Sequence, residues 1–350
     1  MKSSFICPLT GGKIFEVESK LEDYITIFIP TYKNEHLLLA CVKACLEQTY
    51  KKINVVVFDN GYRESKGLLK DGLKKLNDDR LFYHKNPTNI DLYGNFYLIL
   101  SYASETSRFM LITADIILTN YCIEKLNNAY NANNSVNLAF GKTLVRDINK
   151  TKLSSKLQPV EKDYVQDGWP YKKSSIYSSN TIIRYFYSFF NLNSELSHFS
   201  FINSLIDGAL IKSIGLTRSS LLWHGGEEYL TLKILSFSKN VSILNEYIYI
   251  LYTNNKRLGL AERPKLLNYT RYEPILNEYN YLKEFEPILI TRGVSVFKLN
   301  IFLIFKIIYS MIRYPGMVFL MLFKLIKLII KTFFILFPIE IALSINKKIK

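Results

Sequence analysis

Three carboxylates in the 350-residue chain stand where they could do chemistry. Asp115 lies within the apolar run "RFMLITADIIL" (108–118), where an uncompensated charge would be costly to bury. Glu227 and Glu228 follow a Gly-Gly turn in "HGGEEYLTLKILSFS" (224–238). A carboxylate can bind a divalent cation, and it can also accept a proton from a hydroxyl group. The alternatives are a solvated turn for Asp115 and an exposed helix N-terminus for the two glutamates.

Other polar residues follow three earlier apolar runs. They are Pro30-Thr31-Tyr32 after "YITIFIP", Asp59-Asn60 after "INVVVFDNG", and Asn86 to Asn89 after "RLFYHKN". Turn propensity alone would explain each cluster separately. If the runs are parallel strands, however, their carboxyl ends meet at one edge of a sheet, and ligands bind there in open α/β sheets. We therefore predict one binding edge that gathers these clusters with Asp115.

The elements that must position these residues alternate along the first third of the chain. Helical periodicity between the apolar runs predicts a βαβαβαβ order, with a mostly parallel central sheet and helices on both faces. The predicted fold class is thus α/β and Rossmann-like. Two later strands are expected at 136–145 and 241–253. The earlier strands are expected at 24–30, 53–61, 80–86 and 108–118, and the helices at 34–48, 65–76 and 91–103.

The composition indicates a folded chain, with 49% apolar and 21% charged residues. The net charge is +15, of which +7 falls in residues 299–350. Because the sequence has no arginine-rich run and no aromatic–basic motif, we expect no nucleic-acid partner.

The spacing of Cys41 and Cys45 favours core packing over a metal or redox pair. The first residues lack an apolar stretch long enough for a signal peptide, so a cytoplasmic location is expected.

The segment 302–343 is almost entirely apolar apart from spaced bases. On a helix advancing about 100° per residue, Lys324, Lys327 and Lys331 fall within about 60° of one another. A narrow basic stripe on an apolar helix is typical of a helix lying in the membrane interface. We therefore predict membrane-associating helices in 299–350. The alternatives are one transmembrane helix near 316–338, which would place lysines near its middle, and a buried helical hairpin.

Four segments of the chain, taken in order, resemble the inverting glycosyltransferases of family 2, which have the GT-A nucleotide-sugar fold. The segments are "ITIFIPTYKNEHLLLACVKACLEQTYKKINVVVFDNG", "NPTNIDLYGNF", "FMLITADIILTNY" and "GGEEYLTLKIL". The resemblance covers roughly residues 24–255. It implies a GT-A domain over 24–260, with a nucleotide-binding half (24–118) and an acceptor half (119–260). The remainder divides into an N-terminal extension (1–23), a linker or helical region (261–298) and the membrane-associating tail (299–350).

On the donor side, the resemblance assigns nucleotide-binding roles to residues at the strand ends. Asp59 matches the acid that pairs with the edge of the base, usually uracil. The expected cradle of base and ribose is Pro30, Thr31, Tyr32 and Glu35, and the expected lining of the nucleotide pocket is Asn89, Gly94, Asn95 and Ala114.

On the reaction side, Asp115 matches the last ligand of the acidic metal-binding motif, which implies Mg²⁺ or Mn²⁺ as cofactor. The ion would offset the charge that develops on the diphosphate leaving group. Glu228 matches the catalytic base that deprotonates the acceptor hydroxyl. Glu227 is included in the catalytic pair because a neighbouring carboxylate makes it harder for both to stay ionised.

The sequence departs from the family pattern at three places. Ala114 stands where relatives have a further acid beside Asp115, and the base is Glu228 where Asp is usual. The family's Arg-x-His after the last strand is replaced by Thr253-Asn254-Asn255, so Lys256 or Arg257 is expected to meet the pyrophosphate. His224 is either a substitute ligand or, in the simpler interpretation, a capping or core histidine.

The sequence therefore predicts a glycosyltransferase that moves a sugar from a nucleotide donor, expected to be a UDP-sugar, with inversion. The predicted acceptor is a saccharide or lipid-linked glycan, and the predicted role is bacterial surface-polysaccharide synthesis. Because of the tail, we expect a peripheral enzyme on the cytoplasmic face of the bacterial inner membrane. The alternative, suggested by Ala114, is a catalytically impaired relative that acts as a membrane-bound scaffold for nucleotide-sugars or glycans.

Overall fold

The computed structural model describes most of the first 253 residues and four isolated positions beyond them. The described ranges are 2–6, 13–18, 24–32, 35–61, 68–147, 164–165, 173–186, 201–216 and 227–253, with residues 304, 322, 326 and 329. The chain divides into two compact units, one comprising 1–179 and 196–264 and the other 180–195 and 265–350. The candidate site residues all lie in the first unit.

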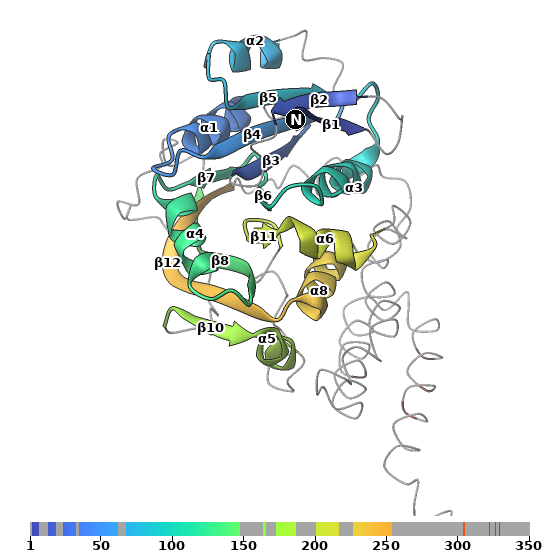
Figure 1. Cartoon of the computed structure of the whole chain (residues 1–350), viewed down its shortest axis with the longest axis vertical. Coiled ribbons are helices and arrows are strands. Elements are labelled where there is room, and N and C mark those ends of the chain that lie inside the picture. Colours follow the sequence, from blue (N-terminus) through green and yellow to red (C-terminus); the bar gives the residue numbers. More distant parts are fainter. Residues whose placement is uncertain are drawn as a thin grey trace, which may run out of the picture. The chain divides into compact units, whose positions relative to one another are not determined.

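Four parallel strands form one half of the large sheet (Figure 1). Their spatial order is β6-β3-β4-β5, and each pair is parallel. β-Branched and aromatic residues dominate β3 and β4, which are buried along their whole length, as expected for central strands of a parallel sheet. The bounds are β3 Ile25–Thr31, β4 Ile53–Asp59, β5 Leu81–Lys85 and β6 Arg108–Leu111.

Helices pack on both faces of this half, as predicted. Ile25, Ile27 and Ile29 of β3 share a core cluster with residues of α1, including Cys41 and Cys45. On the alternate face, the Phe28 ring contacts Phe58 and Phe109, and Phe58 contacts Tyr102 of α3. The helices of this half are α1 Glu35–Leu46, α2 Leu68–Lys74 and α3 Asp91–Ala103.

The other half of the sheet is mixed, and its order continues from β6 as β11-β8-β12-β10. Strand β11 is antiparallel to both β6 and β8, whereas β8 and β12 run parallel. Strands β1 and β2 pair with each other in a separate antiparallel two-stranded sheet. The remaining bounds are β1 Lys2–Ile6, β2 Lys13–Glu18, β7 Ile116–Leu118, β8 Val136–Asp147, β9 Tyr164–Val165, β10 Ser175–Ser178, β11 Leu205–Asp207, β12 Asn240–Thr253, α4 Cys122–Asn131, α5 Ser179–Phe186, α6 Gly208–Ile214 and α8 Glu227–Phe237.

The prediction of one strand over 108–118 is wrong. Strand β6 ends at Leu111, and β7 begins at Ile116 and pairs antiparallel with β12 instead of continuing beside β3. The break occurs because Tyr252 of β12 donates its backbone N–H to the carbonyl of Asp115, which redirects the chain toward a different neighbour. Asp115 therefore lies in the connection between two strands, at the carboxyl end of β6.

The cysteines on α1 and α4 are core residues, as predicted for Cys41 and Cys45. Cys41, Cys45 and Cys122 are free thiols and fully buried.

The predictions for 261–298 and for the basic stripe of the tail fall outside the described residues. Among the residues that the structure describes, no helix is both long and apolar enough to cross a membrane.

Candidate functional site

Asp59 is the last residue of β4 and lies at the carboxyl edge of the parallel strands. It is aligned with Thr31 of β3 on one side and Lys85 of β5 on the other. Its side chain is only 1% exposed, so the carboxylate needs hydrogen-bond donors from the protein or a ligand. Tyr83 supplies one, since its hydroxyl donates to Asp59 Oδ2 at 2.7 Å. The predicted base-binding acid is thus held in place at the predicted edge.

Asn60, the next residue, joins the end of β4 to the β5–α3 loop through four hydrogen bonds. Its Nδ2 donates to Asn89 Oδ1 and to the Asp91 carbonyl, both at 2.9 Å. Its Oδ1 accepts from the Ile90 N–H and from Asn86 Nδ2, both at 3.1 Å. All hydrogen-bonding positions of this buried amide are therefore used.

The same network includes three of the residues predicted to line the nucleotide pocket, Asn89, Gly94 and Asn95. Asn86 Nδ2 donates to Asn95 Oδ1 at 3.1 Å, and Asn89 Oδ1 also accepts from the Asp91 N–H. Gly94 donates its N–H to Asp91 Oδ1 at 2.6 Å in the first turn of α3. These contacts fix the loop that leads into α3, where the lining of the nucleotide pocket is predicted.

Gly61 permits a close approach between this loop and the end of β4. Its φ of +76° is in the left-handed region, which favours glycine. A Cβ at this position would lie 2.6 Å from the Thr88 carbonyl carbon. Only a glycine therefore lets the turn after Asn60 lie directly against the backbone at Thr88 and Asn89.

Thr31 and Pro30 are buried at the end of β3, and the Thr31 carbonyl accepts the Asn60 N–H at 3.0 Å. Tyr32, the next residue, is 42% exposed, which leaves an aromatic surface beside the edge. Glu35 begins α1, but its side chain lies outside the described ones. The structure thus gathers Pro30, Thr31, Asp59, Asn89 and Asn95 at one edge of the sheet.

Asp115 lies at the carboxyl end of the next strand, β6, and is half-buried. Its Oδ1 accepts a hydrogen bond from the Thr113 hydroxyl. Cys41 of α1 donates its thiol to the Thr113 carbonyl at a sulfur–oxygen distance of 3.8 Å. The pKa of that thiol is raised well above its ordinary value, first by its hydrogen bond with Cys45, then by burial, with a smaller contribution from the charge of Asp115. Ala114, between Thr113 and Asp115, is buried.

The described side chains contain no cluster of three or more His, Cys, Asp or Glu that could hold a metal by themselves. Mg²⁺, however, is usually bound by one or two carboxylates together with substrate phosphates and water. The half-buried carboxylate of Asp115 fits that type of site, because a diphosphate would supply the other oxygens.

Glu227 and Glu228 are the first two residues of α8, and their side chains are outside the described set. The helix is anchored one turn later, where the buried Thr231 hydroxyl accepts the Phe201 N–H at 3.2 Å. The two acids therefore begin a fixed helix, at the end where its dipole favours negative charge. His224, Lys256 and Arg257 also lie outside the described residues.

Tyr83 was not predicted at this edge, whereas Asn60 and Asn86 were predicted to lie there but were given no role of their own. Asn60 and Asn86 are recognisable as polar residues at strand ends, but their bonding partners are not. Tyr83 carries no sequence signal, since it lies in an apolar strand and its partner Asp59 is 24 residues earlier.

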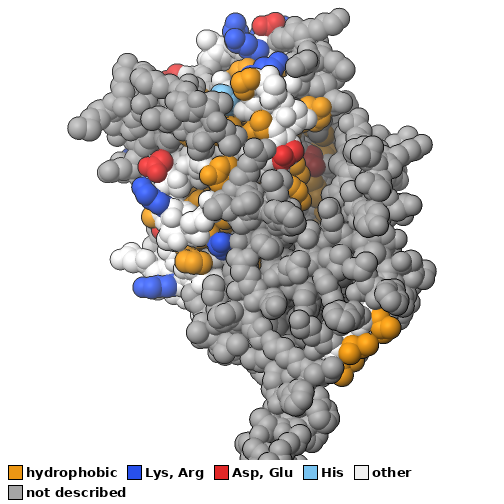
Figure 2. All heavy atoms as spheres, turned by 90° about the vertical axis from the view of Figure 1, so that its right-hand side faces the viewer, with side chains coloured by type: hydrophobic (Ala, Val, Ile, Leu, Met, Phe, Trp, Pro, Cys, Tyr) orange, Lys and Arg blue, Asp and Glu red, His pale blue; other side chains and the backbone are white. Residues whose placement is uncertain are grey.

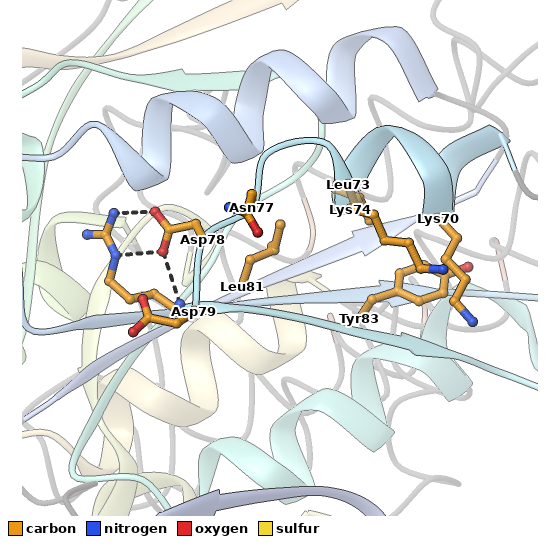
Figure 3. Close-up of a pocket in the computed structure, with 9 residues that line it drawn as sticks. Lys70, Leu73, Lys74, Asn77, Asp78, Asp79, Leu81 and Tyr83 are labelled. Carbon is orange, nitrogen blue, oxygen red and sulfur yellow. Dashed lines mark hydrogen bonds and ion pairs between the residues drawn. The ribbon is translucent and has the colours of Figure 1, made fainter.

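A cavity of about 760 Å³ lies between α2 and β5 and includes Tyr83 in its wall. Figure 3 shows Lys70, Lys74 and Tyr83 at one end, and Asp78 and Asp79 toward the other. Asp78 is paired with Arg80 at 2.6 Å, which lowers the pKa of that carboxyl. Lysine and arginine side chains also gather at the top of the face in Figure 2, the end of the molecule at which Figure 1 places α2.

Comparisons with solved structures show the fold of the chain. It is similar to S. aureus TarS 1–349 in complex with UDP-GlcNAc, with a TM-score of 0.54 and 13% identity, covering 82% of this chain and 72% of that one. The complex of the same protein with UDP has the same TM-score and identity, with 85% and 74% coverage. A mannosyltransferase, PcManGT from Pyrobaculum calidifontis, in complex with GDP-Man and Mn²⁺, has a TM-score of 0.48, with 12% identity and 92% and 89% coverage. The likeness to the two TarS structures shows a fold of the GT-A type.

Comparison of the sequence with curated proteins gave no match. The family profile described as "Glycosyl transferase family 2" matches residues 26–212, which is more than half of the chain. The matched range runs from the second residue of β3 into α6, and therefore includes the carboxyl ends of β3, β4, β5 and β6. The chain belongs to glycosyltransferase family 2.

Proposed function

We propose that the chain transfers a sugar from a UDP-sugar to a saccharide or lipid-linked acceptor, with inversion at the anomeric carbon. The observation that carries the proposal is the position of Asp59, a buried acid held by Tyr83 at the carboxyl edge of the parallel strands. A carboxylate accepts hydrogen bonds only, so it complements the N3–H donor of uracil. The complexes of TarS with UDP-GlcNAc and UDP support a nucleotide-sugar of this class, since that protein shares the fold.

In the proposed reaction, Glu228 removes the proton from the acceptor hydroxyl as its oxygen attacks the anomeric carbon. The bond from that carbon to the diphosphate breaks on the opposite face, and UDP departs. Asp115 would hold Mg²⁺ or Mn²⁺, which supplies positive charge against the leaving diphosphate. Support for Glu228 comes from its place in the first turn of α8, whose register is fixed by Thr231.

Turnover of nucleotide-sugars by the full chain tests this proposal. UDP- and GDP-sugars would be offered with and without Mn²⁺ to the purified protein and to its Glu228→Gln variant. We expect UDP-sugar hydrolysis or transfer that the variant loses. Tight binding without turnover of any donor would instead support the scaffold, for which the specific observation is Ala114 in place of a second acid.

We also propose that the tail binds the membrane surface, so that the enzyme acts on membrane-proximal acceptors in bacterial surface-glycan synthesis at the cytoplasmic face of the inner membrane. Leu322, Ile326 and Ile329 support this, because each is helical and between 41% and 48% exposed. Their spacing of four and three residues puts them on one face of a helix. Exposed apolar residues on one face are typical of a helix that lies in the interface.

Flotation with anionic vesicles tests the proposed membrane surface. Replacement of Leu322, Ile326 and Ile329 by Ser in the full chain should move the protein from the floating to the soluble fraction. Leu92→Ser is the control, since Leu92 is 56% exposed on α3. Unchanged flotation of the triple variant would contradict the proposal.

A further inference from the structure

Tyr83 connects two features that are otherwise separate, the base-binding acid and the cavity beside α2. It is aligned with Val57 in the β4–β5 register, two residues before Asp59. Side chains two residues apart on a strand share a face, and diagonal neighbours across strands are within reach of an aromatic residue. The phenol therefore extends along β4 to Asp59 Oδ2, at 2.7 Å.

This hydrogen bond restricts the carboxylate of Asp59. Hydrogen bonds from a hydroxyl to an ionised carboxylate are roughly twice as strong as bonds between neutral groups. At 1% exposure, solvent is a poor substitute for the phenol, so the bond fixes the plane of the carboxylate. The backbone at Asp59 is fixed as well, since its carbonyl accepts the Asn86 N–H at 2.8 Å.

The orientation of this carboxylate decides which pyrimidine it favours. Uracil presents a donor at N3, whereas cytosine presents an acceptor there, which a carboxylate oxygen repels. Discrimination of this kind depends on an acceptor that cannot turn away from the wrong base. We propose that Tyr83 is a positioning residue that orients Asp59 and thereby sets the preference of the site for uracil over cytosine. This inference rests on the proposed UDP-sugar function.

Tyr83 can be changed without disturbing the core. Its ring lines the cavity beside Lys70, Leu73 and Lys74 and is half-buried, so Tyr83→Phe removes the hydroxyl and leaves the ring contacts. Tyr50→Phe is a matched control, because Tyr50 is also half-buried, packs against the core, and precedes β4 at the end of the strand remote from Asp59.

Calorimetric titration of the full chain with UDP and with CDP tests the inference. For Tyr83→Phe we expect UDP binding to weaken about tenfold, as for loss of one hydrogen bond to a charged group. CDP binding should change less, so the UDP:CDP preference falls several-fold. With a UDP-sugar, KM should rise while kcat stays within about twofold, because Tyr83 does not touch the reacting atoms. Tyr50→Phe should leave UDP binding, CDP binding, KM and kcat unchanged.

Equal weakening of UDP and CDP, or no change in either, would overturn the positioning role. The Asp59→Asn variant separates this failure from that of the proposed function. If the wild-type protein binds UDP and Asp59→Asn weakens that binding, an unchanged UDP:CDP ratio in Tyr83→Phe contradicts this inference alone. If the wild-type protein does not bind UDP, both the UDP-sugar function and the inference are wrong.

Discussion

The edge at the carboxyl ends of β3, β4 and β5 and the connection around Asp115 hold their polar side chains in different ways. At the edge of β3, β4 and β5, Asn60 makes four hydrogen bonds and Asp59 is almost fully buried. Asp115, after β6, is half-buried and accepts from Thr113, a hydroxyl two residues away. The first arrangement ties three strand ends together, whereas the Thr113–Asp115 hydrogen bond joins side chains of the same connection.

This difference indicates how the two parts contribute to function. A network with satisfied partners is rigid and can discriminate between ligands before they bind. The half-buried carboxylate of Asp115 is better suited to a ligand that brings its own oxygens and cation. We therefore expect changes at Asn60 to act on stability and donor affinity, and changes at the reaction side to act on turnover.

The largest effect is expected at the start of α8. Glu228→Gln should lower the rate of sugar transfer about 10²- to 10⁴-fold, the usual contribution of a general base. Glu227→Gln is the matched control, since it removes the adjacent charge from the same helix turn, and its rate should fall by less than tenfold. Equal losses in the two variants, measured with saturating donor, would show that the first turn of α8 acts only through its charge.

Asn60→Ala should lower the free energy of unfolding by about 2–4 kcal/mol, because it removes four hydrogen bonds and takes an acceptor from the buried amide of Asn86. UDP affinity should fall as well, since the loop into α3 loses its attachment to β4. Asn120→Ala, at an exposed turn residue, should stay within about 0.5 kcal/mol. Urea unfolding measures both variants. A stable Asn60→Ala protein with unchanged UDP affinity would contradict the rigid-edge interpretation.

Comparison of Gly61→Ala with Gly215→Ala measures the cost of disturbing the close approach between Gly61 and the backbone at Thr88 and Asn89. Both glycines have positive φ, 76° and 62°, so both variants bear the cost of a left-handed alanine, about 1 kcal/mol. The two positions differ in the space around an added Cβ. At Gly61 the backbone of Thr88 and Asn89 would lie within 3 Å of it, whereas at Gly215 no atom would lie within 4 Å. We expect Gly61→Ala to be the more destabilising in thermal or urea unfolding, by at least about 1 kcal/mol. Equal losses of unfolding free energy in the two variants would show that the backbone at Thr88 and Asn89 moves away from the added Cβ without cost.

The smallest expected effect is a dependence of stability on pH at His84. Burial lowers the pKa of His84, and its bond to Asn86 and the charge of Asp59 oppose that change only partly. The unfolded chain therefore binds the proton at higher pH than the folded one, so the free energy of unfolding falls as pH drops below about 6.5. Because the ring is only partly buried, the loss should be a few tenths of a kcal/mol.

His84→Gln should flatten that dependence between about pH 7 and pH 5, since glutamine does not titrate there. Urea unfolding at several pH values measures the difference between the variant and the wild-type protein. An identical pH profile for the two proteins would show that other groups cause the decline.

Local pattern was sufficient to predict much of the fold. The run of β-branched residues in β4 and the periodicity of α3 predict a strand and a helix at those places, because burial on two faces or on one stripe leaves a visible signature. The break between β6 and β7 was not predictable, since it depends on pairing with β12, more than 130 residues later.

The candidate site divides in the same way. The strand-end positions of Thr31, Asp59 and Asp115 follow from the order of elements, whereas the Tyr83–Asp59 bond depends on the β4–β5 register. The shared role of Asn60 and Asn86 likewise requires two strand ends to be adjacent, which a single sequence does not reveal.

Titration of the full chain with UDP is the most direct test of the account, because every proposed step requires that nucleotide at Asp59. Asp59→Asn and Asp78→Asn would be compared, since Asp78 is an acid of the neighbouring cavity that is paired with Arg80. We predict that UDP binds the wild-type and Asp78→Asn proteins equally and binds Asp59→Asn at least about tenfold more weakly. UDP binding that is unaffected by Asp59→Asn would contradict the central claim.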